Sequence, residues 1–195
     1  MDKRKPTREE AYELLTKYIK SENLIKHALA VEGVMLHFAE ILGEEDIEKW
    51  GIIGLVHDID YEMYPELHCK KAVEILEENN WPEDYIHAVV SHGWEICTDV
   101  KPESRMEKVL YTIDELTGLV TAVALMRPSK SIHDTELKSV KKKWKQKNFA
   151  AGANREIIEK GAEMLGLDLD FIIDETIKGM RKVADSIGLE GNNNT

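Results

Sequence analysis

Hydrophobic residues recur at the spacing of an α-helix along nearly the whole chain. Positions i, i+3, i+4 and i+7 are apolar in one segment after another, and no alternating run of useful length indicates a β-strand. Capping boxes at Thr7 and Ser104, each followed three residues later by Glu, mark two helix starts. The pattern predicts an all-α fold with helices from residue 7, from 21 or 23 to 43, from 44–46 onward, and over 66–79, 81–93, 104–126, 154–165 and 170–187.

The length of 195 residues suits one domain, which we place at residues 1–190 because no linker or repeat divides the chain. Its C-terminal helices are expected within residues 134–188, and the first of them is rich in lysine. The Asn-rich tail 191–195 is expected to be disordered. Gly118, inside the long hydrophobic helix, predicts a point where another helix approaches closely.

The most hydrophobic segment, residues 51–56, is followed directly by His57 and Asp58. A run that is apolar on every side is buried inside a protein. An ionised carboxylate in such a place is usually paired or bound to a metal, because burying an unpaired charge is costly. The pattern therefore predicts that other segments supply partners for Asp58.

Two more acid–base residues lie where the helical pattern expects apolar side chains. His27 belongs to the apolar stripe of the second helix, and Asp114 lies inside the hydrophobic stretch 109–126. A set of buried, hydrogen-bonded polar residues is the simpler alternative, but two buried carboxylates would then need several dedicated donors. We therefore favour a metal site, and imidazole with carboxylate suits iron, manganese, zinc, nickel or magnesium.

The sequence around these residues resembles the motifs of the HD superfamily of metal-dependent phosphohydrolases. Residues 26–31 are similar to the first motif, residues 54–60 to the second, and residues 114–120 to the last as it occurs in a small uncharacterised bacterial branch. The resemblance covers roughly residues 20–130 and implies a helical bundle of the HD type with its metal-site core in that region. It also implies four metal ligands, which are His27, His57, Asp58 and Asp114.

His68 and His92 lie between the His-Asp pair and the last aspartate, where family members with two metals carry extra histidines and the His-Asp carboxylate bridges both ions. We consider both as ligands of a second ion, with substrate contact or helix capping as the alternative. The nucleotidase branch also carries an acidic residue shortly after His-Asp. Asp60 and Glu62 match that position imperfectly, so Asp60 is interpreted first as a turn residue and second as a base or a support for a metal ligand.

Arg127, Lys130 and Arg155 are candidates for binding a phosphate group. Arg127 lies about 20 Å of helix beyond Asp114, too far to reach the same metal unless the substrate is long or the helix bends. Lys130 lies on a loop that is able to fold back. The lysine-rich helix is most simply a solvated face, with a patch for a polyanionic substrate as the alternative.

The composition narrows the partners and the cellular location. A net charge of −11 argues against general affinity for nucleic acid or an anionic membrane. Cys69 and Cys97 form no CxxC pair, which favours a reducing cytoplasm, and the charged N-terminus shows no secretory signal. No apolar run approaches the ~20 residues that span a bilayer.

We therefore expect a cytoplasmic hydrolase in which one or two divalent ions activate a water molecule. Asp58 is the expected catalytic residue, because it would orient that water as well as bind metal. The resemblance implies a nucleotide or another small phosphate ester or anhydride as the substrate. Two alternatives remain open. One is a di-iron oxygenase with six protein ligands, which would be His27, His57, Asp58, His68, His92 and Asp114. The other is a non-catalytic metal-stabilised module that binds a nucleotide or a partner protein. The sequence leaves the oligomeric state open.

Overall fold

The computed structural model describes residues 3–191, and helices joined by loops make up this part of the chain. It contains nine α-helices and one short 3₁₀ helix, and an isolated bridge between Trp94 and Thr98 is the nearest approach to a strand within it. The all-α prediction is confirmed, while the predicted disordered tail lies, apart from Gly191, outside the described residues. The elements are α1 (Arg8–Tyr18), α2 (Glu22–Ile41), α3 (Ile47–Val56), η1 (Pro65–Leu67), α4 (Lys70–Glu78), α5 (Glu83–Ser91), α6 (Arg105–Leu125), α7 (Leu137–Trp144), α8 (Arg155–Leu165) and α9 (Leu169–Lys182).

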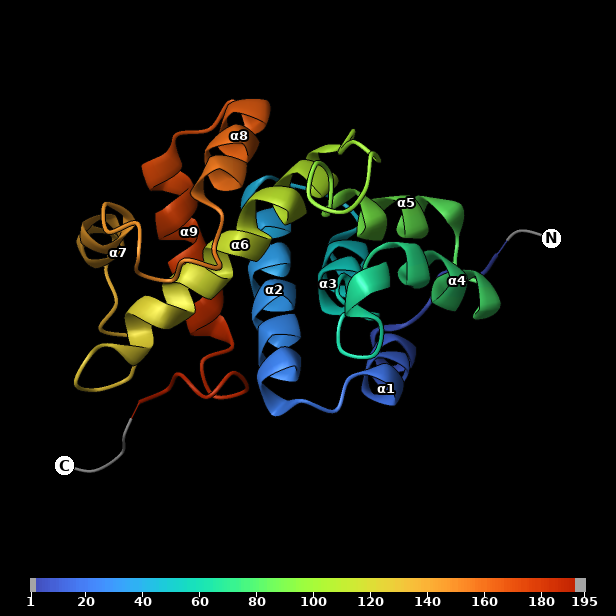
Figure 1. Cartoon of the computed structure of the whole chain (residues 1–195), viewed down its shortest axis with the longest axis horizontal. Coiled ribbons are helices and arrows are strands. Elements are labelled where there is room, and N and C mark those ends of the chain that lie inside the picture. Colours follow the sequence, from blue (N-terminus) through green and yellow to red (C-terminus); the bar gives the residue numbers. More distant parts are fainter. Residues whose placement is uncertain (1–2, 192–195) are drawn as a thin grey trace.

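Helices α2 and α6 cross in the middle of the molecule (Figure 1). Helices α1, α3, α4 and α5 lie on one side of α2, and α7, α8 and α9 lie on the other. Helix α2 packs against α3, α6 and α9, and α6 packs against α8 as well. One cluster of buried apolar side chains runs from Ala11 to Leu189 through all of these interfaces. The crossing of α2 and α6 is therefore where both halves of the chain meet.

Close packing of α3 against α2 fixes the position of the His-Asp pair. Every residue of α3 from Trp50 to Val56 is buried, as the unbroken apolar run predicts. A side chain at Gly54 would begin 2.8 Å from Met35 Cγ and 3.2 Å from the carbonyl oxygen of Val31, so glycine lets the two helices touch there. Helix α3 ends at Val56, and the residues that follow it, His57 and Asp58, lie beside His27 in the first half of α2.

The prediction of a close helix approach at Gly118 is wrong. A Cβ atom built on Gly118 would meet no heavy atom within 4 Å, because this face of α6 borders open space instead of a helix. The two predicted capping boxes are confirmed, since Thr7 and Ser104 each accept a hydrogen bond from the Glu backbone three residues on.

The predicted helix over residues 66–79 is interrupted. The 3₁₀ helix η1 ends at Leu67, and α4 begins only at Lys70. Between them Cys69 adopts a φ of 66°, a left-handed conformation that an α-helix does not contain. His68 consequently lies in the break, outside any helix.

Helices α7 and α9 are shorter than the sequence pattern indicates. Helix α7 ends at Trp144, so Lys145 and Lys147 lie beyond it, and α9 ends at Lys182 instead of near residue 187. No helix within the described residues is long and apolar enough to cross a membrane.

Candidate metal centre

The first cluster of polar side chains forms where α2, the end of α3 and α6 meet. Asp58 Oδ2 lies 3.2 Å from His57 Nε2 and 3.8 Å from His27 Nε2. Asp114 Oδ1 lies 2.9 Å from His27 Nε2 and 3.3 Å from His57 Nε2. One donor atom from each of the four residues lies within 4.8 Å of the other three. A single ion would therefore reach all four residues that the sequence assigns to the metal.

A second cluster faces the other oxygen of the same carboxylate. Asp58 Oδ1 lies 3.4 Å from His68 Nε2 and 3.3 Å from His92 Nε2. These two nitrogen atoms lie 3.2 Å from each other. His68 comes from the break before α4, and His92 follows the last residue of α5. The two oxygens of Asp58 thus point to two separate groups of histidines.

Three of the histidines are held in one tautomer. Each bonds through Nδ1 to an oxygen that accepts but does not donate: Gly54 O for His57, Val89 O for His92 and Asp60 Oδ1 for His68. Each Nδ1 therefore carries a proton and donates it. In the neutral ring the lone pair then lies on Nε2, which is the atom that faces the cluster.

In the neutral rings these lone pairs face carboxylate oxygens and one another instead of hydrogen-bond donors. His57 Nε2 is buried and makes no hydrogen bond. Two lone pairs 3.2 Å apart, as on His68 and His92, repel each other unless one ring gains a proton or an ion lies between them. Converging imidazole nitrogens and carboxylate oxygens are ligands that divalent transition metals bind. The residues present fit such an ion at each cluster.

A family model for the HD domain matches residues 24–119, a range that contains both clusters. The chain belongs to the HD superfamily. The resemblance drawn from the three motifs is confirmed, and this superfamily consists mostly of metal-dependent phosphohydrolases. Assignment to its small bacterial branch stays a prediction. No solved structure matches the chain.

Electrostatics in this HD site favour charged groups despite burial. Burial opposes protonation of His57, but the carboxylates of Asp58 and Asp114 hold its pKa well above the usual range. Burial likewise opposes ionisation of Asp58, yet His57 and His92 hold its pKa well below the usual range. The Asp114 pKa is lowered for the same reason, by His57 and His27. In the metal-free protein a proton on His57 thus partly offsets the two carboxylates.

Asp60 supports the second cluster. Its side chain is fully buried, and Oδ1 accepts the Nδ1 proton of His68 at 2.8 Å. Its other oxygen accepts the backbone N–H of Ala72 at 2.8 Å, in the first turn of α4. Asp60 therefore holds His68 in position and anchors the helix that follows the break. Asp60 is therefore more than a turn residue, because it supports a histidine of the second cluster. The sequence signal for this role is an acidic residue two positions after the buried His-Asp pair.

Replacing Asp60 by Asn is expected to weaken metal binding at the second cluster by about 10–100-fold. The amide NH₂ would face either the His68 Nδ1–H or the Ala72 N–H, and two donors cannot bond to each other. Calorimetric titration of the metal-free protein measures the two affinities. The first cluster should keep its affinity, and the exposed Asp134→Asn should behave like wild type. Equal affinities in Asp60→Asn and wild type would contradict this role.

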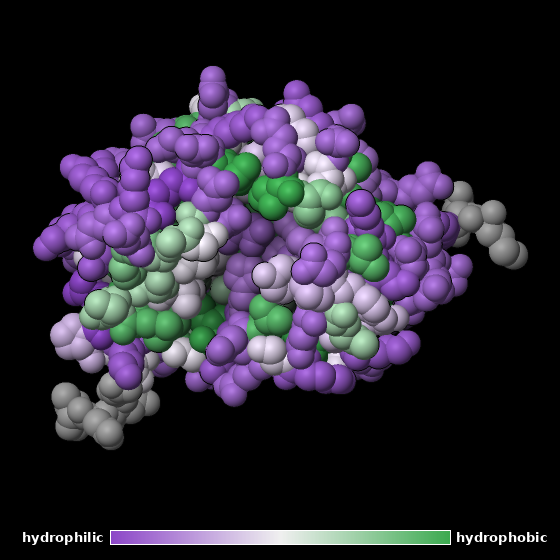
Figure 2. All heavy atoms as spheres, viewed as in Figure 1, coloured by the Kyte–Doolittle hydropathy of each residue, from purple (hydrophilic) through white to green (hydrophobic). Residues whose placement is uncertain are grey.

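A cavity of about 510 Å³ opens onto both clusters. Figure 2 shows a hollow near the centre of this face with a hydrophilic floor and hydrophobic surface on its borders. The described lining includes three carboxylates, Asp58, Asp114 and Glu115, and no lysine or arginine. Cys97 also lines the cavity. A hydrogen bond from the Cys69 thiol, 2.9 Å away, lowers the pKa of Cys97 to about 6.

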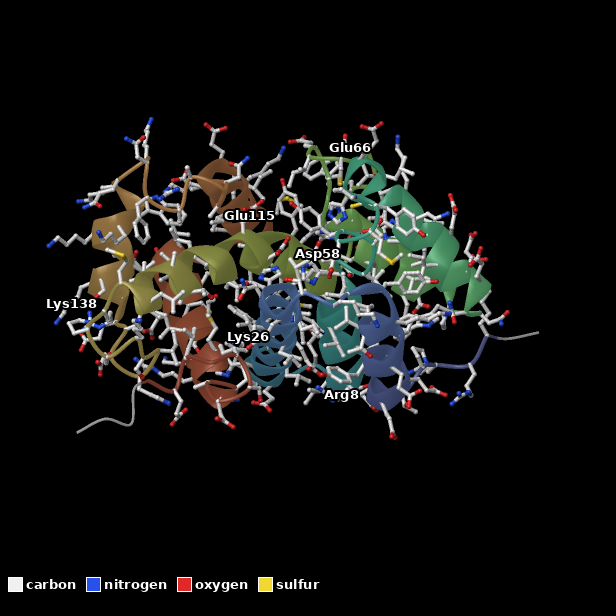
Figure 3. All side chains as sticks on the ribbon, turned by 60° about the horizontal axis from the view of Figure 1, so that its bottom comes forward. Arg8, Lys26, Asp58, Glu66, Glu115 and Lys138 are labelled. Carbon is white, nitrogen blue, oxygen red and sulfur yellow. The ribbon has the colours of Figure 1, made fainter. Side chains whose placement is uncertain are left out.

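The structure does not bring the predicted phosphate-binding cations to this cavity. Arg127 donates to Ser139 beyond the far end of α6, and the exposed Lys130 occupies a turn with a φ of 52°. The Arg155 guanidinium donates to four backbone oxygens between Trp144 and Ala153, so it shapes the loop over the cavity. The lysine-rich helix α7 is also distant from the metal centre. In Figure 3 its residue Lys138 lies at the opposite end of the molecule from α4 and α5, well away from Asp58.

Proposed function

We propose that this protein hydrolyses a small phosphate ester or anhydride, such as a nucleotide, with the help of two divalent ions. The observation that carries the proposal is the orientation of Asp58, whose two oxygens face two separate histidine clusters 3.2–3.4 Å away. A carboxylate shared in this way would hold two ions close together. Membership of the HD superfamily supports the same reaction class.

The side chains divide into two sets. His27, His57 and Asp114 would hold one ion, and His68 with His92 would hold the other. Ions bound there supply an activated water and neutralise charge on the phosphate. Asp58 lies at the floor of the cavity between both sets, so we assign it the additional task of orienting the attacking water. The Nδ1 hydrogen bonds of three histidines fix the ring orientations, so that each Nε2 atom would face a bound ion.

The charge of the cavity makes the ions essential for substrate binding. A phosphate group would meet three carboxylates and no lysine or arginine among the described residues of the wall. Like charges in a partly buried cavity repel strongly, because water screens them poorly there. Positive charge at the two clusters reverses this repulsion. The protein without metal is therefore expected to bind phosphate compounds weakly.

Metal analysis combined with a phosphatase screen tests the proposal. The protein should contain up to two ions per chain and should hydrolyse members of a panel of nucleoside mono-, di- and triphosphates and cyclic dinucleotides. Removal of the ions by a chelator should abolish hydrolysis, and adding them back should restore it. Full metal occupancy without turnover on the whole panel would overturn the proposal and favour a metal-stabilised binding module.

One observation also favours a di-iron oxygenase. Six nitrogen- and oxygen-bearing side chains surround the two positions, and this ligand set suits iron as well as other ions. Anaerobic purification separates the two functions. Two irons with a mixed-valent signal and no phosphatase activity would favour the oxygenase, whereas hydrolysis with redox-inert ions would exclude it.

A further inference from the structure

A second cavity adjoins the cavity over the metal centre. Its volume is about 370 Å³, and its walls come from α2, the second half of α6 and residues 187–189. His27 and Gly118 belong to the linings of both cavities. The two spaces therefore meet beside a residue of the first metal cluster, and we call the second one the side pocket.

Gly118 stands at the junction of the two cavities. Glycine in a helix interior costs about 1 kcal/mol relative to alanine, so its presence needs a reason. Packing does not supply one, because a Cβ atom at Gly118 would meet no heavy atom within 4 Å. In contrast, a Cβ atom at Gly54 or Gly161 would collide with a neighbouring helix. Gly118 instead leaves unfilled the space where the linings of the two cavities meet, which we call the passage.

The walls of the side pocket combine aliphatic side chains with a few polar ones. The apolar members are Ala30, Leu125, Ile187 and Leu189, and the polar members include Asn23, Lys26 and Thr121. Lys26 is the single lysine or arginine among the described lining residues, and its ammonium group pairs with Glu22 at 2.5 Å. A chain of phosphates would need several cations, whereas an organic group with a few polar edges matches this surface. Leu125, a large apolar side chain that is half exposed, gains a partner in such a complex.

We propose that the side pocket holds the organic leaving group of the substrate, a phosphate monoester of an alcohol about the size of a nucleoside. This inference rests on the proposed function. The volume falls in the range of about 300–1,000 Å³ that is typical of small-molecule sites. Water attacks the phosphorus, the bond from phosphorus to the ester oxygen breaks, and that oxygen takes up a proton. Inorganic phosphate and the free alcohol are the products.

Replacing Gly118 by leucine tests the proposal, because the new side chain would narrow the passage. Acetyl phosphate serves as the small reference substrate, since its acetyl group is too short to fill the side pocket. The ratio of kcat/KM for nucleoside 5′-monophosphates to kcat/KM for acetyl phosphate is expected to fall by about 10-fold or more. Ala122→Leu is the matched control, because Ala122 lies one helical turn further on and lines neither cavity. Thr121→Leu narrows the pocket from its own wall and should act in the same direction.

Binding of an uncharged nucleoside gives a readout that does not depend on turnover. Calorimetry should detect adenosine or another nucleoside binding to the metal-free wild-type protein and to Ala122→Leu, and weaker binding to Gly118→Leu. Unchanged selectivity ratios in both Gly118→Leu and Thr121→Leu would overturn the inference while leaving the hydrolase intact. Absence of hydrolysis on every substrate would overturn the proposed function. The nucleoside titration would then show by itself whether the side pocket binds an organic group.

Discussion

Replacing Asp58 by alanine is expected to remove both metal ions and to lower the rate of hydrolysis by about 1,000-fold or more. Asp58 Oδ2 lies 3.2 Å from His57 Nε2, and Oδ1 lies 3.3 Å from His92 Nε2, so one truncation takes a ligand from both clusters. Each loss of about 1.4 kcal/mol in transition-state stabilisation is tenfold in rate, and metal ions supply several kcal/mol.

Two further variants distinguish a bridging carboxylate from an ordinary ligand. Asp114→Ala removes a ligand of the first cluster alone, so this variant should retain the ion held by His68 and His92. Asp185→Ala, at an exposed position on the C-terminal segment, should keep wild-type metal content and activity. Mass spectrometry of the metal content and steady-state kinetics provide the two measurements. Wild-type metal content and turnover in Asp58→Ala would refute the assignment.

The first cluster could be predicted from the sequence because its residues violate the helical pattern. His27, His57 and Asp114 occupy positions where apolar side chains are expected, and such violations are costly unless the groups bind something. The helices α2 and α6 are long, and α3, which precedes His57, is buried from Trp50 onward, so the spacing of hydrophobic residues predicts all three well. The resemblance to the HD motifs then assigned the residues a common role, and the structure brings them together.

The second cluster depends on local geometry that the spacing of hydrophobic residues does not encode. A continuous helix over 66–79 would have fixed His68 on a helix face, whereas the break at Cys69 releases it towards His92. That break is stabilised by the buried carboxylate of Asp60, which bonds to both His68 and Ala72. A tertiary hydrogen bond of this kind overrides helix propensity, and no sequence rule gives its partners.

The sequence does not predict which residues line the cavities. The charge of Arg127 and Lys130 predicts phosphate binding, but carboxylates and histidines line the cavity, and positive charge would have to come from ions. A glycine inside a helix usually indicates close contact with a neighbouring helix, but open space borders Gly118. Both cases turn on where cavities lie, which depends on how whole helices pack.

The stability of the metal-free protein should fall as pH rises above neutrality. The pKa of His57 is raised in the folded state. Protonated His57 therefore contributes fully to the free energy of unfolding below the unfolded-state pKa of about 6.5, and this contribution is lost as pH rises through the folded-state pKa. Asp58 and Asp114 have lowered pKa values, so their contributions are present above about pH 4 and are lost only in acid. Deprotonation of His57 leaves the two carboxylates facing each other with less positive charge.

Bound ions should reverse this trend, so the stabilisation that metal provides is expected to grow from pH 6 to pH 8.5. Ions bind to deprotonated histidines and carboxylates, and their binding releases the proton from His57. At about 100 times the dissociation constant an ion adds ~2.7 kcal/mol, which raises the Tm of a chain this size by about 5–10 °C. Calorimetric melting curves with and without chelator, at both pH values, measure the difference. The metal-dependent rise in Tm should vanish in Asp58→Ala, because that variant lacks the shared ligand. An equal metal-dependent rise in Tm at both pH values in the wild type would show that His57 carries no proton in the metal-free state.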